Sequence, residues 1–161
     1  ALQVAPRLRL ELQSSLSIQE TSERLLSGKI DAAMIPPLAA EREGLLQRVL
    51  VRTKDVVFFD PSHPLEEGDI DAYCSRPHVR IGSGRTVGFD IDRWLVGHGR
   101  KRHIAVQASD FDTALDLLKG TPLIATLPET LARDGIASVP PIWPQESLDL
   151  AMVWHLRNHS S

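Results

Sequence analysis

The segment HIAVQASDFDTALDLLKGTPLIATLP, residues 103–128, carries the pattern that decides the fold. Its two ends, residues 103–106 and 123–125, are short apolar runs typical of buried strands. Between them, Ser109 or Asp110 can cap a helix whose apolar residues recur at helical spacing. That apolar face consists of Phe111, Ala114, Leu115 and Leu118. A strand, a helix of about ten residues and a second strand predict a β-α-β crossover between parallel strands.

The same alternation extends over the chain. We expect further strands at residues 8–12, 30–35, 45–51, 56–59, 79–81 and 148–154, and further helices at 18–26, 69–74 and 91–98. Ser17 and Glu20 form a capping box for the first helix, and Thr126 with Glu129 forms another that predicts a helix ending at Gly135. The pattern indicates an α/β fold with a mainly parallel sheet. Ligands of such sheets bind at the carboxyl ends of the strands, where helix N-termini favour anionic groups.

Composition excludes several classes of function. The chain has 161 residues, a net charge of -3 and one cysteine, Cys74. It therefore offers no internal disulfide and no cysteine-based zinc site, and its acidic balance argues against nucleic-acid binding by this segment alone. No apolar run is long enough to span a membrane, and residues 1–6 do not resemble a signal peptide.

Three local motifs have both a functional and a structural interpretation. The loop from Gly82 to Gly88 has GxGxxxG spacing, which favours a flexible strand–helix turn near a ligand over a dinucleotide site. His98 and His103 lack metal-ligand spacing and fit a solvated helix end. Cys74 has no evident histidine partner and is better explained as a small apolar residue than as a nucleophile. We therefore expect no catalytic residues, no metal site and no cofactor.

Several segments, in order, resemble the regulatory domain of LysR-type transcriptional regulators. Four of them, at 77–79, 110–111, 123–128 and 152–157, match the branch that responds to aromatic inducers, which includes nodulation and aromatic-degradation activators. The matching segments are APRLRL (5–10), LSGKIDAA (26–33), DVVFFDPSHPL (55–65), PHV (77–79), DF (110–111), LIATLP (123–128) and MVWHLR (152–157). Each motif is weak alone, but together they cover nearly the whole chain.

The resemblance implies a periplasmic-binding-protein-like fold of type 2. Two Rossmann-like lobes would share the chain, with residues 1–52 in the first lobe, 53–140 in the second, and 141–161 returning to the first. The two crossovers would lie within 50–56 and 139–147. A small-molecule effector, most simply an aromatic one, would bind in the cleft between the lobes.

By motif position, the resemblance also implies the residues of the binding site. These are Ile35, Pro36, Pro37, Phe59, His63, Ser83, Gly84, Asp110, Phe111, Thr126 and Trp154. Asp110 stands where this branch commonly has histidine. Because a carboxylate repels an anionic inducer, a neutral, phenolic or cationic effector fits as well as an aromatic acid.

The resemblance further implies parts that this sequence does not contain. The winged helix-turn-helix and its linker helix would contact DNA, and the regulator would be a cytoplasmic homodimer or homotetramer with the helix at 18–26 as an interface candidate. A first strand, between those at 8–12 and 30–35, is also expected upstream. Direct pairing of those two strands would refute that expectation. The alternatives are a transporter's solute-binding protein and an enzyme on the same fold, although no acid–base or nucleophile–base pair supports an enzyme.

Overall fold

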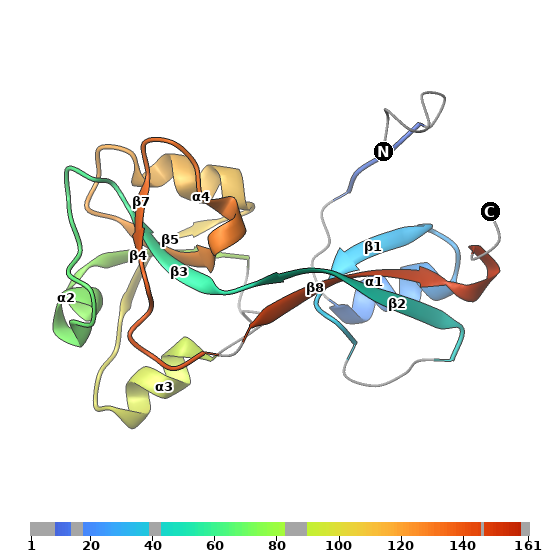
Figure 1. Ribbon diagram of the computed structural model, residues 1–161, viewed down its shortest axis with the longest axis horizontal. Coiled ribbons are helices and arrows are strands. Elements are labelled where there is room, and N and C mark those ends of the chain that lie inside the picture. The colour runs from blue at the N-terminus through green and yellow to red at the C-terminus, as the bar shows by residue number, and fades with distance from the viewer. Residues whose placement is uncertain (1–8, 14–17, 39–42, 83–89, 146, 159–161) are drawn as a thin grey trace.

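The computed structural model describes residues 9–13, 18–38, 43–82, 90–145 and 147–158, which form two lobes joined by extended segments (Figure 1). Lobe I contains α1 (Ile18–Leu26), β1 (Ala32–Ile35), β2 (Leu45–Thr53), β8 (Leu148–His155) and the 3-10 turn η2 (Leu156–Asn158). Lobe II contains β3 (Asp55–Phe59), α2 (Ile70–Ser75), β4 (Pro77–Ile81), α3 (Ile91–Gly97), β5 (His103–Ala108), α4 (Phe111–Leu118), β6 (Ile124–Pro128), the 3-10 turn η1 (Glu129–Leu131) and β7 (Ala137–Val139).

Lobe II is a five-stranded mixed sheet with helices on both faces. Its strand order is β5-β4-β6-β3-β7, with β4 parallel to β5 and β6, and β3 antiparallel to β6 and β7. The α4 side is a core of Phe58, Val79, Ala108, Ala114, Leu115, Leu118, Ala125 and Leu127. The α2 and α3 side is a second core of Val57, Phe59, Leu65, Tyr73, Ile91, Leu95, Ile124 and Trp143. Burial on both faces explains why the neighbouring strands β3 and β6 are apolar at nearly every position.

Lobe I is thinner. Its sheet has the order β1-β8-β2, and both pairings are antiparallel. The helix α1 packs Leu25 against Ile35, Ala151 and Val153 on one face. Successive strand residues point to opposite faces, so Met152, between Ala151 and Val153, lies on the other face and is exposed.

The end of α1 is held by the last described residues of the chain. The Arg157 guanidinium donates to the Leu25 carbonyl at 2.6 Å and to the Leu26 carbonyl at 3.2 Å. The final carbonyls of a helix have no partner within the helix, and a cation there also suits the helix dipole. Arg157 therefore fastens α1 to the end of β8.

Three sequence predictions of secondary structure were wrong. Residues 9–12 form no strand and Leu12 is 89% exposed, because they have no partner strand among the described residues; Leu8 lies outside that range. They also do not pair with β1, so the pairing that would have refuted a missing first strand is not seen. Thr126 begins no helix, since β6 continues to Pro128 by pairing with β3 and only the short turn η1 follows. Lobe I, within its described part, is antiparallel rather than parallel.

The other predicted helices and strands lie where the sequence places them, to within a few residues, whereas the sequence pattern did not predict the short strand β7. Ser17, the expected cap of α1, lies outside the described residues. No helix in the described ranges is long and apolar enough to cross a membrane.

Candidate functional site

The two extended segments that join the lobes meet at one end of the lobe II sheet. Gln145, before β8, donates to the Asp55 carbonyl at 2.6 Å and accepts from the Asp55 backbone N–H at 3.1 Å. The N–H of Glu129, just after β6, donates to the Lys54 carbonyl at 2.8 Å. The carboxyl end of β6 therefore lies directly beside the connection to lobe I; this end of the sheet is called the crossover end below.

The parallel strands β4 and β5 finish at the same end. The N–H of Gly82, which follows β4, donates to the carbonyl of Ala108, the last residue of β5, at 2.9 Å. Gly82 has φ of 70°, a left-handed conformation that favours glycine. Ser83 and Gly84, two of the expected site residues, lie outside the described residues.

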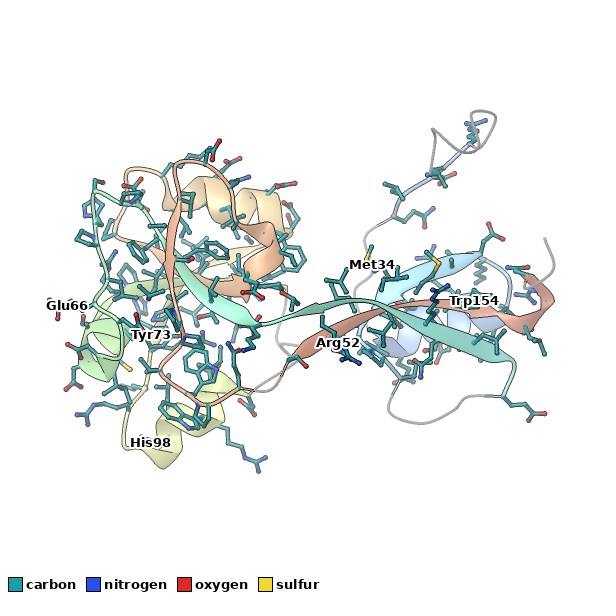
Figure 2. All side chains as sticks on the ribbon, viewed as in Figure 1. Met34, Arg52, Glu66, Tyr73, His98 and Trp154 are labelled. Atoms are coloured by element: carbon teal, nitrogen blue, oxygen red, sulfur yellow. The ribbon has the colours of Figure 1, made fainter. Side chains whose placement is uncertain are left out.

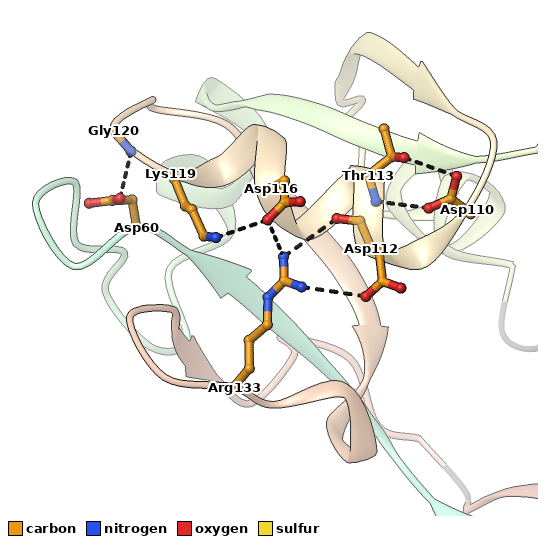
Figure 3. A network of polar contacts seen from close by, with 8 residues as sticks. All are labelled: Asp60, Asp110, Asp112, Thr113, Asp116, Lys119, Gly120 and Arg133. Atoms are coloured by element: carbon orange, nitrogen blue, oxygen red, sulfur yellow. Dashed lines mark hydrogen bonds and ion pairs between the residues drawn. The ribbon is translucent and has the colours of Figure 1, made fainter.

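Asp110 caps the helix that follows β5. Its carboxylate accepts hydrogen bonds from the Thr113 N–H at 2.8 Å and the Thr113 hydroxyl at 2.9 Å (Figure 3). It also accepts one from the Ser109 hydroxyl at 2.8 Å. These bonds, led by the Thr113 N–H, hold the pKa of Asp110 below its usual range, so the carboxylate is charged at neutral pH. Phe111, the first residue of α4, is 44% exposed although it is aromatic.

Ion pairs link the exposed side of α4 to the turn after η1. Arg133 donates to Asp116 at 2.8 Å and to Asp112 at 3.4 Å, and Lys119 donates to Asp116 at 2.9 Å (Figure 3). These exposed pairs join the turn after η1 to the helix. They orient the helix rather than take part in a site.

Thr126 lies on the face of β6 that α2 and α3 cover. Its hydroxyl is 3.0 Å from the hydroxyl of Tyr73, which belongs to α2 and is buried. The Arg102 guanidinium donates to the Tyr73 hydroxyl oxygen at 3.4 Å. Burial is the main reason that the pKa of Tyr73 is raised, so its hydroxyl keeps its proton.

Arg102 is a nearly buried cation that sequence reasoning missed. Its side chain is only 4% exposed, and it makes a two-point ion pair with Asp92 of α3, at 2.7 Å and 3.2 Å. Burial opposes the charge of Arg102, but the bonds to Asp92 and Tyr73 outweigh it and raise its pKa. The same bond lowers the pKa of Asp92. Arg102 belongs to a basic run, residues 100–102, and such runs are usually exposed to solvent. The sequence alone therefore offers no reason to expect a buried ion pair at Arg102.

Two further basic residues share this face of the sheet. Arg80 of β4 lies two positions after His78, and continuing the β4–β6 register places it opposite Thr126. The buried Nε of Arg80 makes no hydrogen bond. His78 is fully buried, and its Nε2 contacts the Tyr73 carbonyl at 3.0 Å. Burial lowers the pKa of His78 to about 4. The alternation of His78 and Arg80 with Val79 and Ile81 is the one sequence signal that could have revealed this polar stripe.

Phe59 and His63 lie at the opposite end of the sheet. Phe59 pairs with Ile124 at the start of β6 and is buried in the core, and the turn after β3 carries the half-buried His63. Asp60 anchors that turn by accepting from the Gly120 N–H at 2.6 Å. His63 therefore lies beyond that end of the sheet, whereas Phe59 shares with Thr126 the face that α2 and α3 cover, two positions apart along β6.

The expected residues of lobe I are also dispersed. Ile35 is buried under α1, while Pro36 and Pro37 follow it and are half-buried. Trp154 lies on the open face of the sheet with Met34, far from Tyr73 in lobe II (Figure 2). That face is hollowed by about 580 Å³ between Asp31, Ala32, Arg48, Leu50, Met152, Trp154 and Asn158.

Other chemistry has little support. Within the described ranges, no three His, Cys, Asp or Glu side chains gather closely enough to hold a metal ion. Burial raises the pKa of the Cys74 thiol, which disfavours the reactive thiolate.

The architecture, two α/β lobes joined by two crossing segments, defines the class of the protein. The family "LysR substrate binding domain" matches residues 2–161, and the chain belongs to this family. Its fold is that of LysR effector-binding domains, which is periplasmic-binding-protein-like of type 2, as the sequence predicts. The family is one of transcriptional regulators and not of enzymes.

Individual relatives agree with this assignment. The chain is 27% identical over 155 residues to the HTH-type transcriptional activator NahR of Pseudomonas putida, covering 91% of this chain and 50% of the relative. It is 31% identical over 150 residues to nodulation protein D of Rhizobium leguminosarum bv. trifolii, covering 88% and 46%. The chain thus spans about half the length of these curated relatives.

Solved structures are similar as well. A probable transcriptional regulator from Pseudomonas aeruginosa superposes with a TM-score of 0.77 at 27% identity, covering 97% of this chain and 55% of that chain. The BenM effector-binding domain with its effector benzoate superposes with a TM-score of 0.67, covering 96% of this chain and 73% of that chain. At 19% identity, the latter likeness concerns the fold alone.

Proposed function

We propose that this effector-binding domain takes a small aromatic molecule at the crossover end of the lobe II sheet and thereby controls transcription. The observation that carries the proposal is the position of Asp110 and Phe111 just past the carboxyl end of β5, at the same end of the sheet as the connection to lobe I, with Thr126 two residues before the end of β6. Carboxyl ends of parallel strands are the usual ligand sites of α/β sheets. An exposed aromatic ring, Phe111, and a half-buried hydroxyl, Thr126, supply apolar and polar contacts of the kind small-molecule sites use.

A ligand beside the crossover end would favour one relative arrangement of the lobes over others. The segments that connect the lobes are hydrogen-bonded to each other there, through Asp55 and Gln145. A ligand that contacts both lobes beside this connection therefore favours one arrangement over the others. Such a bias is the population shift by which a bound effector changes activity at a distant site. The lobe boundaries that accompany this proposal are 1–52, 53–140 and 141–161.

The rest of the regulator is part of the same proposal. DNA would be contacted by a winged helix-turn-helix outside this sequence, in a cytoplasmic homodimer or homotetramer. Two likenesses support an aromatic effector by analogy: the resemblance of the sequence to the branch that responds to aromatic inducers, and the fold shared with a BenM domain whose effector is benzoate. The other residues expected from the sequence remain candidates. In the first lobe these are Ile35, Pro36, Pro37 and Trp154, and in the second they are Phe59, His63, Ser83 and Gly84.

A thermal-shift screen of aromatic acids, phenols and flavonoid-like compounds tests the proposal, because a ligand of the native state raises the melting temperature. Hits are then compared by calorimetry in Phe111→Ala, Thr126→Ala and a control, Val96→Ala, which removes an exposed apolar side chain on α3. We expect affinity to fall by about tenfold in the first two variants and to hold in the third. Unchanged affinity in both site variants would overturn the proposed location.

A further inference from the structure

The hydrogen bonds around Thr126 have a fixed direction. Arg102 is the starting point, since a guanidinium has five N–H donors and no acceptor. Its N–H therefore donates to the Tyr73 hydroxyl oxygen, and the Asp92 carboxylate holds the guanidinium in place from the other side. The Tyr73 hydroxyl has one proton, which points away from the cation.

Within the described part of the chain, the acceptor at hydrogen-bond distance from that hydroxyl is the Thr126 hydroxyl oxygen, 3.0 Å away. Tyr73 is 1% exposed, so its hydroxyl cannot turn to solvent instead, and a buried hydroxyl is almost always hydrogen-bonded. Tyr73 thus donates and Thr126 accepts. The proton of the Thr126 hydroxyl is then left for another acceptor.

We propose that Arg102 and Tyr73 are positioning residues that commit Thr126 to act as a hydrogen-bond donor, so that the effector presents an acceptor oxygen, a carbonyl or carboxylate, to Thr126. This inference rests on the proposed function, which places the effector beside Thr126. The buried Nε of Arg80, which the β4–β6 register places opposite Thr126, makes no hydrogen bond, and such an N–H also favours an electron-rich group. A ligand that offers only an N–H or O–H donor at this point meets a hydroxyl proton and is disfavoured.

The donor and the acceptor of the Tyr73–Thr126 hydrogen bond can be determined without any ligand. NMR of the chain labelled at tyrosine and threonine should show a slowly exchanging Tyr73 hydroxyl proton with a nuclear Overhauser contact to the Thr126 methyl group. A protected hydroxyl proton coupled to Thr126 Hβ, with none on Tyr73, would overturn the proposal.

The preference for an acceptor oxygen is measured by comparing the affinities of two matched probes, acetophenone and α-methylstyrene. They have the same shape, but acetophenone has a carbonyl oxygen where α-methylstyrene has a CH₂ group. We expect acetophenone to bind at least about fivefold more tightly. Thr126→Val should remove that ratio, and Tyr73→Phe and Arg102→Met should reduce it to about twofold or less. The control Arg100→Met, which removes an exposed ion pair with Asp71, should leave the ratio unchanged.

A ratio near one in the unchanged chain would overturn the inference. The ratio, unlike the affinity itself, does not respond to a general loss of stability. If neither probe binds, the aromatic-effector proposal is contradicted, while the direction of the Tyr73–Thr126 bond is still decided by the NMR result. The two proposals therefore fail separately.

Discussion

The two lobes differ in how many faces of their sheets are covered by helices. Lobe II has helices on both faces and two cores, so polar groups between sheet and helices, such as Tyr73 and Arg102, must find partners inside the protein. Lobe I has one helix on one face, and its other face exposes Met34 and Met152. The comparison teaches that a buried hydrogen-bond network with a fixed donor direction needs a sheet face covered by helices on a sheet whose other face is covered too. Among the described residues, only lobe II provides such a sheet.

The largest expected difference between the lobes concerns apolar packing. Phe58→Ala, in the fully buried α4-side core, should lower the free energy of unfolding by about 3–5 kcal/mol. Met34→Ala, at a side chain 62% exposed on the open face of lobe I, should change it by about 0.5 kcal/mol or less. Urea unfolding measures both. Equal costs would mean that the open face is covered in solution.

The second comparison is between two arginines within lobe II. Arg102→Met should lower the free energy of unfolding by about 1–3 kcal/mol, since it removes the donor to the buried Tyr73 hydroxyl oxygen and the ion pair of Asp92. Arg100→Met removes a pair that is open to solvent and should leave the free energy of unfolding nearly unchanged. Similar costs by chemical denaturation would remove the distinction between a structured and a solvated ion pair.

His78 should make lobe II sensitive to mild acid. Its folded pKa of about 4 lies below the ordinary value of 6.5, chiefly because of burial, so the unfolded chain binds a proton first. Stability is therefore full above pH 6.5 and is lost as the pH falls towards 4, by roughly 2–3 kcal/mol. Unfolding measured at intervals between pH 7 and pH 4.5 should show this loss, and His78→Gln should flatten it. A slope that survives the substitution would assign the effect to another group.

The smallest expected effect is local to the turn after β3. Hydrogen bonds from Ser62 and Gly120 lower the pKa of Asp60 to about 2. An NMR titration of the Asp60 carboxyl carbon should show its midpoint there, and Ser62→Ala should move the midpoint upward by removing the hydroxyl donor. The exposed Asp134, which makes no such contacts in the described structure, serves as the reference carboxyl group. An unmoved midpoint in the variant would show that Ser62 does not hold the carboxylate.

Most of the fold could be predicted from the sequence, because apolar runs and caps are local signals. The cap at Asp110 and the helix from Phe111 follow directly from neighbouring residues. The strand expected at residues 8–12 failed because a strand also needs a partner, which its own sequence does not specify. Thr126 looked like a helix cap, but pairing of β6 with β3 extends the strand past it.

The candidate site was harder to predict for the same reason. Motif position placed Phe59 and Asp110 in one site, yet Phe59 lies beside the start of β6 while Asp110 follows the carboxyl end of β5, since β3 runs antiparallel to β6. Arg102 and Tyr73 carry no sequence signal, because their roles depend on α2 and β5 approaching β6 in space. Local patterns identify elements, whereas partners far apart in the chain define the site.

The most direct test of the account is to find which lobe a bound effector touches. Methyl NMR of threonine and methionine residues, with a compound found by the thermal-shift screen, compares Thr126 in lobe II with Met34 and Met152 on the hollowed face of lobe I. We predict that the Thr126 methyl signal shifts on binding while both methionine signals stay in place. Shifts confined to Met34 and Met152 would contradict the account and locate the effector on the open face of lobe I.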